Sequence, residues 1–179
     1  MTLLTTLRMM WKDWGFAAAV YGQAKHFLDV AKTSQSPAEK DGYVRAAFVF
    51  LVMSVEAHFY EVVRGFIQTN RANLPSKGLD KVEEELKRNT GLQRALREWP
   101  QHLTGKSLDL QGAPYLDLIK IIDYRNWLVH GKIAQTVPSW GILAQEIETI
   151  ENAEAATKTV ALMVTQVSQH FGFKAPDWH

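Results

Sequence analysis

Cysteine is absent from all 179 residues, and this absence excludes several kinds of chemistry. Disulfides, thiolate catalysis and zinc sites built on cysteine are ruled out. The six histidines form neither an HExxH pair nor another close metal-binding spacing, so we expect no metal site and no cofactor. A chain without cysteine is compatible with the cytosol, and we expect a cytoplasmic protein.

A long apolar run and a strong excess of one charge are also missing. The longest apolar run, residues 46–55, is shorter than the roughly 20 residues that cross a bilayer, so we expect no membrane span. The chain has 20 Lys and Arg against 19 Asp and Glu, a net charge of +1. This balance argues against a strongly basic nucleic-acid surface, but it leaves room for a local basic patch.

Three sequence motifs of common enzyme classes are not present. There is no GxxxxGK[ST] loop to hold phosphates and no GxGxxG after a strand. The GxSxG turn that carries a nucleophilic serine in hydrolases is missing as well. The sequence therefore gives no sign of a P-loop nucleotide site, a dinucleotide fold or an α/β-hydrolase.

Helical periodicity dominates what the chain does contain. Residues 43–70 have apolar side chains at three- and four-residue steps and are apolar on most sides near 46–55, which predicts a central buried helix. Further helices are predicted over 9–31, as a pair within 79–99 broken at 89–91 and stopped by Pro100, over 114–131 and over 139–171. No paired strands are evident.

These elements predict an all-α fold, a bundle of four or five main helices. The length suits one domain, here residues 1–179, with a core over roughly 43–171 and an irregular tail over 172–179.

One helix places polar residues among apolar ones, in the stretch YLDLIKIIDYRNWLVHG that ends at Gly131. At about 100° per residue, Asp123 and Asn126 share a stripe with His130, while Arg125 lies about 140° from His130. One straight helix therefore does not place the Arg and His side by side. They could converge if the helix loosens, if the long Arg side chain reaches round, or if a second subunit completes the site.

A purely structural interpretation of these residues is also available. A His before a Gly is a common helix ending, since a cation or donor suits the negative end of the helix dipole. Arg125 could extend along the surface and pair with Glu56 or Asp123. Spacing alone leaves this alternative open.

An Arg, a polar residue directly after it and a His four residues later resemble the signature of the HEPN superfamily. Here the motif reads Arg125, Asn126, then WLV, then His130. The earlier stretch AFVFLVMSVEAHFYEVV also resembles the family's long apolar helix with an acidic residue in its middle, Glu56. The likeness covers these two helices and the order of elements around them, about residues 43–171.

The resemblance implies a metal-independent endoribonuclease that acts as a homodimer, with the motifs of both subunits facing one cleft. A ribose 2′-OH would attack the adjacent phosphate, giving a 2′,3′-cyclic phosphate and a 5′-OH without a cofactor. His130 would transfer the proton, Arg125 would stabilise the phosphate charge, and Asn126 would orient either the imidazole or the phosphate. Glu56 and Asp123 are the expected supporting residues, with Glu56 fixing the orientation of Arg125; an alternative is that Glu56 lies on a solvated face.

Possible RNA contacts lie outside the motif. Arg94 and Arg97 belong to a locally basic segment that could extend an RNA track, although a plain solvated helix face fits the same residues. Lys132 stands where a toxin branch of the family, paired with a nucleotidyltransferase antitoxin, has a Tyr. That particular pairing is therefore in doubt, and Lys132 could contact phosphate instead.

The leading hypothesis is an RNase of a prokaryotic toxin or defence system, with RNA as substrate and an antitoxin or regulatory protein as a possible partner. The main alternative is a non-catalytic HEPN-like module that binds a nucleotide, RNA or a protein. A purely structural helical protein is the third possibility.

Overall fold

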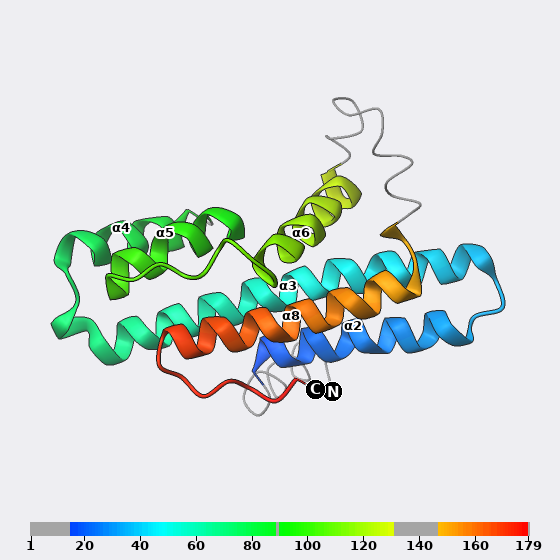
Figure 1. Cartoon of the computed structure of the whole chain (residues 1–179), viewed down its shortest axis with the longest axis horizontal. Helices are drawn as coiled ribbons and strands as arrows, with labels where there is room; N and C mark the ends of the chain where they lie inside the picture. Colours follow the sequence, from blue (N-terminus) through cyan, green and yellow to red (C-terminus); the bar gives the residue numbers. More distant parts are fainter. Residues whose placement is uncertain (1–14, 89, 131–146, 179) are drawn as a thin grey trace, which may run out of the picture.

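The computed structural model describes residues 15–88, 90–130 and 147–178. Within these ranges the chain forms six α-helices and one short 3-10 helix and contains no strand, so the predicted all-α helical bundle is confirmed (Figure 1). The elements are α2 (Phe16–Thr33), α3 (Pro37–Asn70), η1 (Arg71–Asn73), α4 (Ser76–Lys87), α5 (Leu92–Thr104), α6 (Tyr115–His130) and α8 (Ile150–His170).

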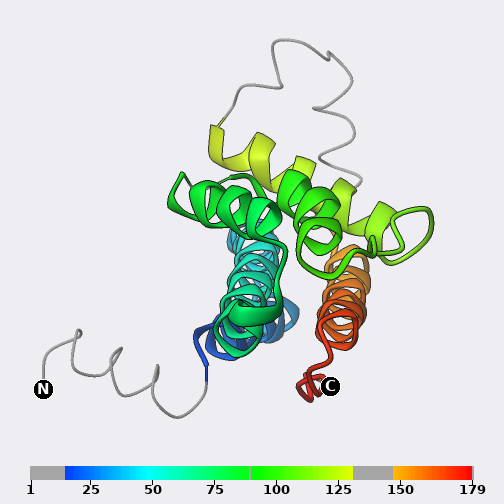
Figure 2. The ribbon, with the colours of Figure 1, turned by 90° about the vertical axis from the view of Figure 1, so that its left-hand side faces the viewer.

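Helix α3 is the centre of the bundle, with α2 and α8 running alongside it (Figure 1). It starts at a favourable cap, because Pro37 is its first residue and the Ser36 side chain accepts a hydrogen bond from the Glu39 amide at 3.4 Å. Helix α6 crosses over both α3 and α8 (Figure 2), and α4 and α5 form a separate antiparallel pair beside it.

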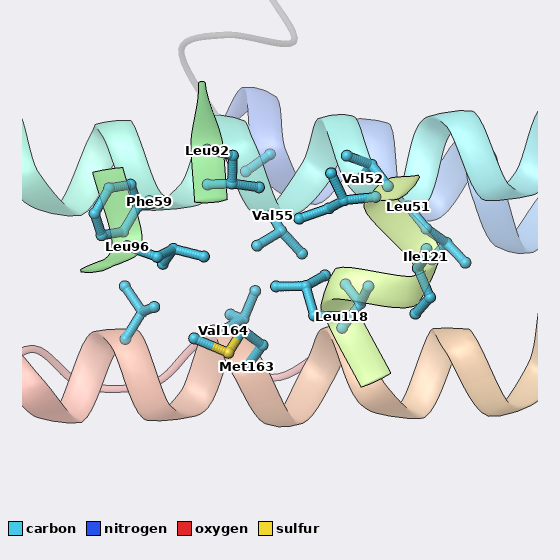
Figure 3. Close-up of a cluster of buried hydrophobic side chains, with 14 of the residues drawn as sticks. Leu51, Val52, Val55, Phe59, Leu92, Leu96, Leu118, Ile121, Met163 and Val164 are labelled. Atoms are coloured by element: carbon cyan, nitrogen blue, oxygen red, sulfur yellow. The ribbon is translucent and has the colours of Figure 1, made fainter. Parts of the chain in front are cut away.

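Side chains of α3, α5, α6 and α8 meet in one part of the core (Figure 3), to which α2 and α4 also contribute buried residues. The labelled side chains are Leu51, Val52, Val55 and Phe59 from α3, Leu92 and Leu96 from α5, Leu118 and Ile121 from α6, and Met163 and Val164 from α8. All ten are buried. Helix α6 is thus held by its apolar face, which leaves its polar residues at the edges of the core.

Helix α3 and η1 together, Pro37–Asn73, are long and apolar enough to cross a membrane by composition alone. The most apolar 18-residue window is 56% buried within the bundle, as in the core helix of a soluble protein. Packing against the neighbouring helices therefore accounts for its apolar composition.

The buried acid Glu85 of α4 links this helix to α5. Trp99 is fully buried, stacks on Phe59 of α3 with ring centroids 5.7 Å apart, and donates its indole N–H to Glu85 at 2.6 Å. Glu85 also accepts from the Arg94 guanidinium at 2.9 Å. The buried carboxylate thus has a donor from the core and a cation from the surface, which offsets its desolvation.

Several predicted helix boundaries were wrong. The central helix α3 begins at Pro37, six residues before the predicted start at residue 43, because Ser36 caps it. Pro100 does not stop α5, which continues to Thr104 and ends at Gly105 with φ 72°; burial of Trp99, Pro100 and Leu103 offsets the hydrogen bond that proline cannot make. Gly15, with φ 58°, is not helical, so α2 begins after it. Helix α8 begins at Ile150 rather than at residue 139, because Thr149 is extended and accepts from the Asn152 amide at 3.1 Å.

Some predicted segments lie outside the described residues, namely 9–14 of the first helix, Gly131, and 139–146 of the last. The described part of the tail, 173–178, has no helix, in line with the irregular tail expected. Trp178 nevertheless is buried, stacking on Tyr21 with centroids 4.7 Å apart and packing edge-on against His58 at 5.4 Å.

His58 is an ionisable group enclosed by this packing. Its Nε2 lies 2.9 Å from the Ser168 hydroxyl oxygen, and both residues are buried. Burial lowers the pKa of His58 from 6.5 to about 4, which a hydrogen bond with the Val164 backbone opposes only in part. The imidazole is therefore neutral in the folded protein at neutral pH.

Two leucines of α6 provide a direct test of the described packing. Leu118 is fully buried, whereas Leu116 is 49% exposed. Leu118→Ala should lower the free energy of unfolding by about 2–5 kcal/mol through lost burial and the remaining cavity. Leu116→Ala should change it by about 0.5 kcal/mol or less in the same urea titration. Equal losses for the two variants would contradict the placement of α6.

The lowered pKa of His58 predicts a pH-dependent stability. The unfolded chain binds a proton near pH 6.5 and the folded chain only near pH 4, so stability should fall as pH decreases between these values. The His58 contribution is about 3 kcal/mol at most. Urea unfolding of the wild type and of His58→Phe across pH 4–8 measures it, because only the wild type should show this component. An identical pH dependence for both proteins would refute it.

Candidate functional site

The rotation of α6 about its axis is set by a tyrosine. Tyr124 is fully buried, packs edge-on against Phe48 of α3, and donates its hydroxyl to Glu148 at 2.7 Å. The other oxygen of Glu148 accepts from Arg45 Nε at 2.8 Å and Nη2 at 2.6 Å. Burial, with the adjacent Glu148 carboxylate, raises the pKa of Tyr124 well above its ordinary value, so the phenol stays protonated.

Arg125 follows Tyr124 and is turned about 100° further round the helix. Its Nη2 lies 3.8 Å from the Glu56 carboxylate on α3, and the two side chains are 19% and 32% exposed. Arg125 Nε is buried and has no hydrogen-bond partner among the described residues. A guanidinium carries five N–H donors, so this long ion pair leaves most of its capacity unused.

Arg125 and Asn126 line one cavity of about 590 Å³ between α3, α5 and α6. Its other polar side chains are Glu56 from α3 and Gln93, Arg94, Arg97 and Glu98 from α5. The structure thus brings together five residues that the sequence nominated on three separate helices: Glu56, Arg94, Arg97, Arg125 and Asn126.

The two arginines of α5 differ in what they are bonded to. Arg94 contacts two acids, Glu85 at 2.9 Å and Glu98 at 3.1 Å. Arg97 donates from Nε to the neutral hydroxyl of Tyr115 at 2.9 Å and has no salt bridge to a described residue. Arg97 and Arg125 are therefore the guanidiniums of this cavity with positive charge available to an anion.

Asp123 does not join this cavity, although it was expected to support Arg125. Its carboxylate accepts from the Gln93 amide at 3.0 Å, and the residue lines a different cavity, between α6 and α8. Glu56, on α3, is instead the acid that lies against Arg125. Of the two partners that spacing allowed for this arginine, the structure selects Glu56.

Two nominated residues cannot be placed in the site. His130 is the last described residue of α6, and its side chain lies outside the described part of the structure. Lys132 lies outside the described residues altogether. On an ideal helix, Arg125 and His130 still differ by about 140°, so their convergence remains a prediction.

Sequence reasoning missed the residues that support the site. Gln93 links α5 to α6, and Arg45 and Glu148 hold Tyr124. No local motif marks them, because their partners are 24 to 103 residues away in the chain. Within 15–88, 90–130 and 147–178, no three His, Asp or Glu side chains gather closely enough to hold a metal ion.

No family model, curated protein or solved structure matches this chain. The chemistry of the site therefore has to be inferred from its own residues. The cavity offers three guanidiniums and two amide side chains against two carboxylates, Glu56 and Glu98, and has no metal-binding cluster among the described residues. One positive charge is left over, which suits the binding of an anionic group such as a phosphate.

Replacing Glu56 or Glu85 with the neutral glutamine should change the free energy of unfolding by very different amounts. Glu56→Gln should change the free energy of unfolding by less than about 1 kcal/mol, because its ion pair is long and partly solvated. Glu85→Gln should lower it by about 2 kcal/mol, because a glutamine oxygen cannot replace both acceptors of Trp99 and Arg94. Thermal and urea unfolding of both variants measure this difference, and a larger loss for Glu56→Gln would contradict it.

Proposed function

We propose that this chain is a HEPN-like, metal-independent endoribonuclease that acts as a homodimer. The observation that carries the proposal is the shared cavity in which Arg125 and Asn126 lie beside Arg97 and Glu56. Arg125 is half-buried, its one ion pair is long, and its buried Nε has no hydrogen-bond partner among the described residues, an arrangement that is costly unless a ligand uses these donors. A phosphodiester is such a ligand, since its oxygens match the fork of a guanidinium.

The proposed reaction needs proton transfer and charge stabilisation, and it needs no metal. His130 takes the proton from a ribose 2′-OH or supplies one to the leaving 5′ oxygen. Arg125 binds the phosphate and stabilises the charge that builds up on it, while Asn126 orients the phosphate or the imidazole. The products are a 2′,3′-cyclic phosphate and a 5′-OH.

The neighbouring residues receive different roles in this proposal. Glu56 orients the Arg125 guanidinium at 3.8 Å without occupying all its donors. Arg97 is the better candidate for a second phosphate contact, because its only described partner is the neutral Tyr115 hydroxyl. Arg94, held by Glu85 and Glu98, supports the α4–α5 pair more than it offers free charge.

The homodimer is supported by the end of α6. Val129, close after Arg125 and Asn126, is a large apolar side chain that is 54% exposed, whereas Trp127 and Leu128 pack against the core. A second copy packed on this end of α6 would cover Val129 and would bring a second motif to the same cleft. We place the protein in the cytoplasm of a prokaryote, as a toxin or defence RNase under an antitoxin or regulatory partner.

The competing function is a non-catalytic HEPN-like module that binds a nucleotide or RNA. A cavity of about 590 Å³ falls within the ordinary range for small-molecule sites, and its donors would hold a phosphate without cleaving it. Under this alternative, binding survives the loss of His130 and no product forms.

RNA cleavage in EDTA separates these functions. The purified protein should cut a mixed single-stranded RNA and leave 2′,3′-cyclic phosphate ends. Arg125→Ala and His130→Ala should each reduce the rate about 100-fold or more, as expected when a charge stabiliser or a proton-transfer group is lost. Arg88→Ala removes an exposed cation paired with Glu84, away from the cavity, and should cleave like the wild type.

The enzyme proposal fails if the wild type is inert on varied RNAs or if both site variants cleave as well as the wild type. An inert wild type that binds RNA, with binding weakened by Arg125→Ala but not by His130→Ala, would establish the non-catalytic alternative.

A further inference from the structure

A second cavity lies on the other flank of α6, between this helix and α8, and has a volume of about 630 Å³. Its apolar surface comes from Phe48 of α3, Ile121 of α6, Ala155 and Ala156 of α8, and Ile147. Polar side chains complete the lining: Asp117, Lys120, Asp123, Asn152 and Thr159. It shares no lining residue with the cavity of Arg125.

The charges of this second cavity do not balance. Lys120 is bonded to Asp117 at 2.8 Å, so these two cancel. Asp123 is half-buried, and its one partner among the described residues is the neutral Gln93 amide at 3.0 Å. One negative charge therefore remains on the wall of a mostly apolar cavity.

We propose that this cavity binds a small organic cation with an apolar body, such as a primary amine that carries an aromatic or aliphatic chain. The ammonium group pairs with Asp123, and the body packs on Phe48, Ile121 and Ile147. The volume lies within the usual 300–1,000 Å³ of small-molecule sites, which are mostly apolar with few polar groups. An anion would meet the uncompensated carboxylate and be repelled.

This site is separate from the proposed RNase chemistry and does not rest on it. It also gives Asp123 a role that the Arg125 cavity does not, because Asp123 lines the second cavity and not the first. A single neutral hydrogen bond satisfies one carboxylate oxygen and leaves the charge free to select a cationic ligand.

Three probes with the same apolar body and different head groups test the proposal: 4-phenylbutylamine, 4-phenylbutanol and 5-phenylpentanoate. Binding at pH 7 is followed through the methyl NMR signals of Ile121 and Ile147, which line the cavity. The amine should shift both signals saturably and bind about fivefold to tenfold more tightly than the alcohol, with the carboxylate weakest.

Three variants make the test specific. Asp123→Asn keeps a carbonyl oxygen for Gln93 but removes the charge, so it should reduce amine affinity to that of the alcohol and leave the alcohol unchanged. Asp80→Asn removes an exposed acid on α4, outside the cavity, and should alter nothing. Ala155→Phe, at an exposed position of α8 on the cavity wall, should weaken all three probes.

Several outcomes would overturn the proposal. They are equal affinities for the three probes, a preference for the amine that survives Asp123→Asn, undiminished binding to Ala155→Phe, or no saturable shift of Ile121 by millimolar amine. Unchanged methyl dispersion in each unliganded variant shows that the fold is intact, so that a loss of binding reports on the cavity.

Discussion

The packing of α3 against several helices at once is the constraint on which the rest of the bundle depends. Its apolar residues point in several directions, and α2, α8, α5 and α6 each cover one of them (Figures 1 and 3). Each of these helices is then oriented by the stripe of apolar side chains that it packs against α3. Because α6 is pressed onto α3 and α8 by Leu118 and Ile121, its polar residues are placed along the edges of that contact, where cavities open on either flank.

A buried carboxylate refines this arrangement at the site. Glu148, which precedes α8, accepts hydrogen bonds from the Tyr124 hydroxyl of α6 and the Arg45 guanidinium of α3, and so links these two helices. Such a contact has directional requirements that apolar packing lacks, so it limits rotation of α6 about its axis. With Tyr124 turned inward, Arg125 and Asn126 lie beside Glu56 and α5, and Asp123 lines the cavity on the other flank while its carboxylate accepts from Gln93 of α5.

Much of the fold could be predicted from the sequence, because apolar periodicity over 43–70 and the turn residues around each helix report local physics. The pairing of Arg125 with Glu56 could be foreseen as one of two options, since a carboxylate on a predicted core helix needs a partner. The cavity that Asp123 lines could not be predicted. Side chains one position apart on a helix point in directions about 100° apart, so a small difference in helix rotation decides which cavity a residue lines. The helix end predicted at Pro100 was wrong because burial of Trp99 and Leu103 outweighs the local tendency of proline to end a helix.

The most direct test of the central claim, that phosphate binds in the cavity of Arg125, is a ¹⁵N NMR titration with a 2′-deoxy dinucleotide, which has no 2′-OH and cannot be cleaved by the proposed reaction. The account predicts saturable shifts for the amides of Gln93, Arg97, Arg125 and Asn126, and their loss in Arg125→Ala. Shifts confined to other surfaces, or shifts at these amides that persist in Arg125→Ala, would contradict it.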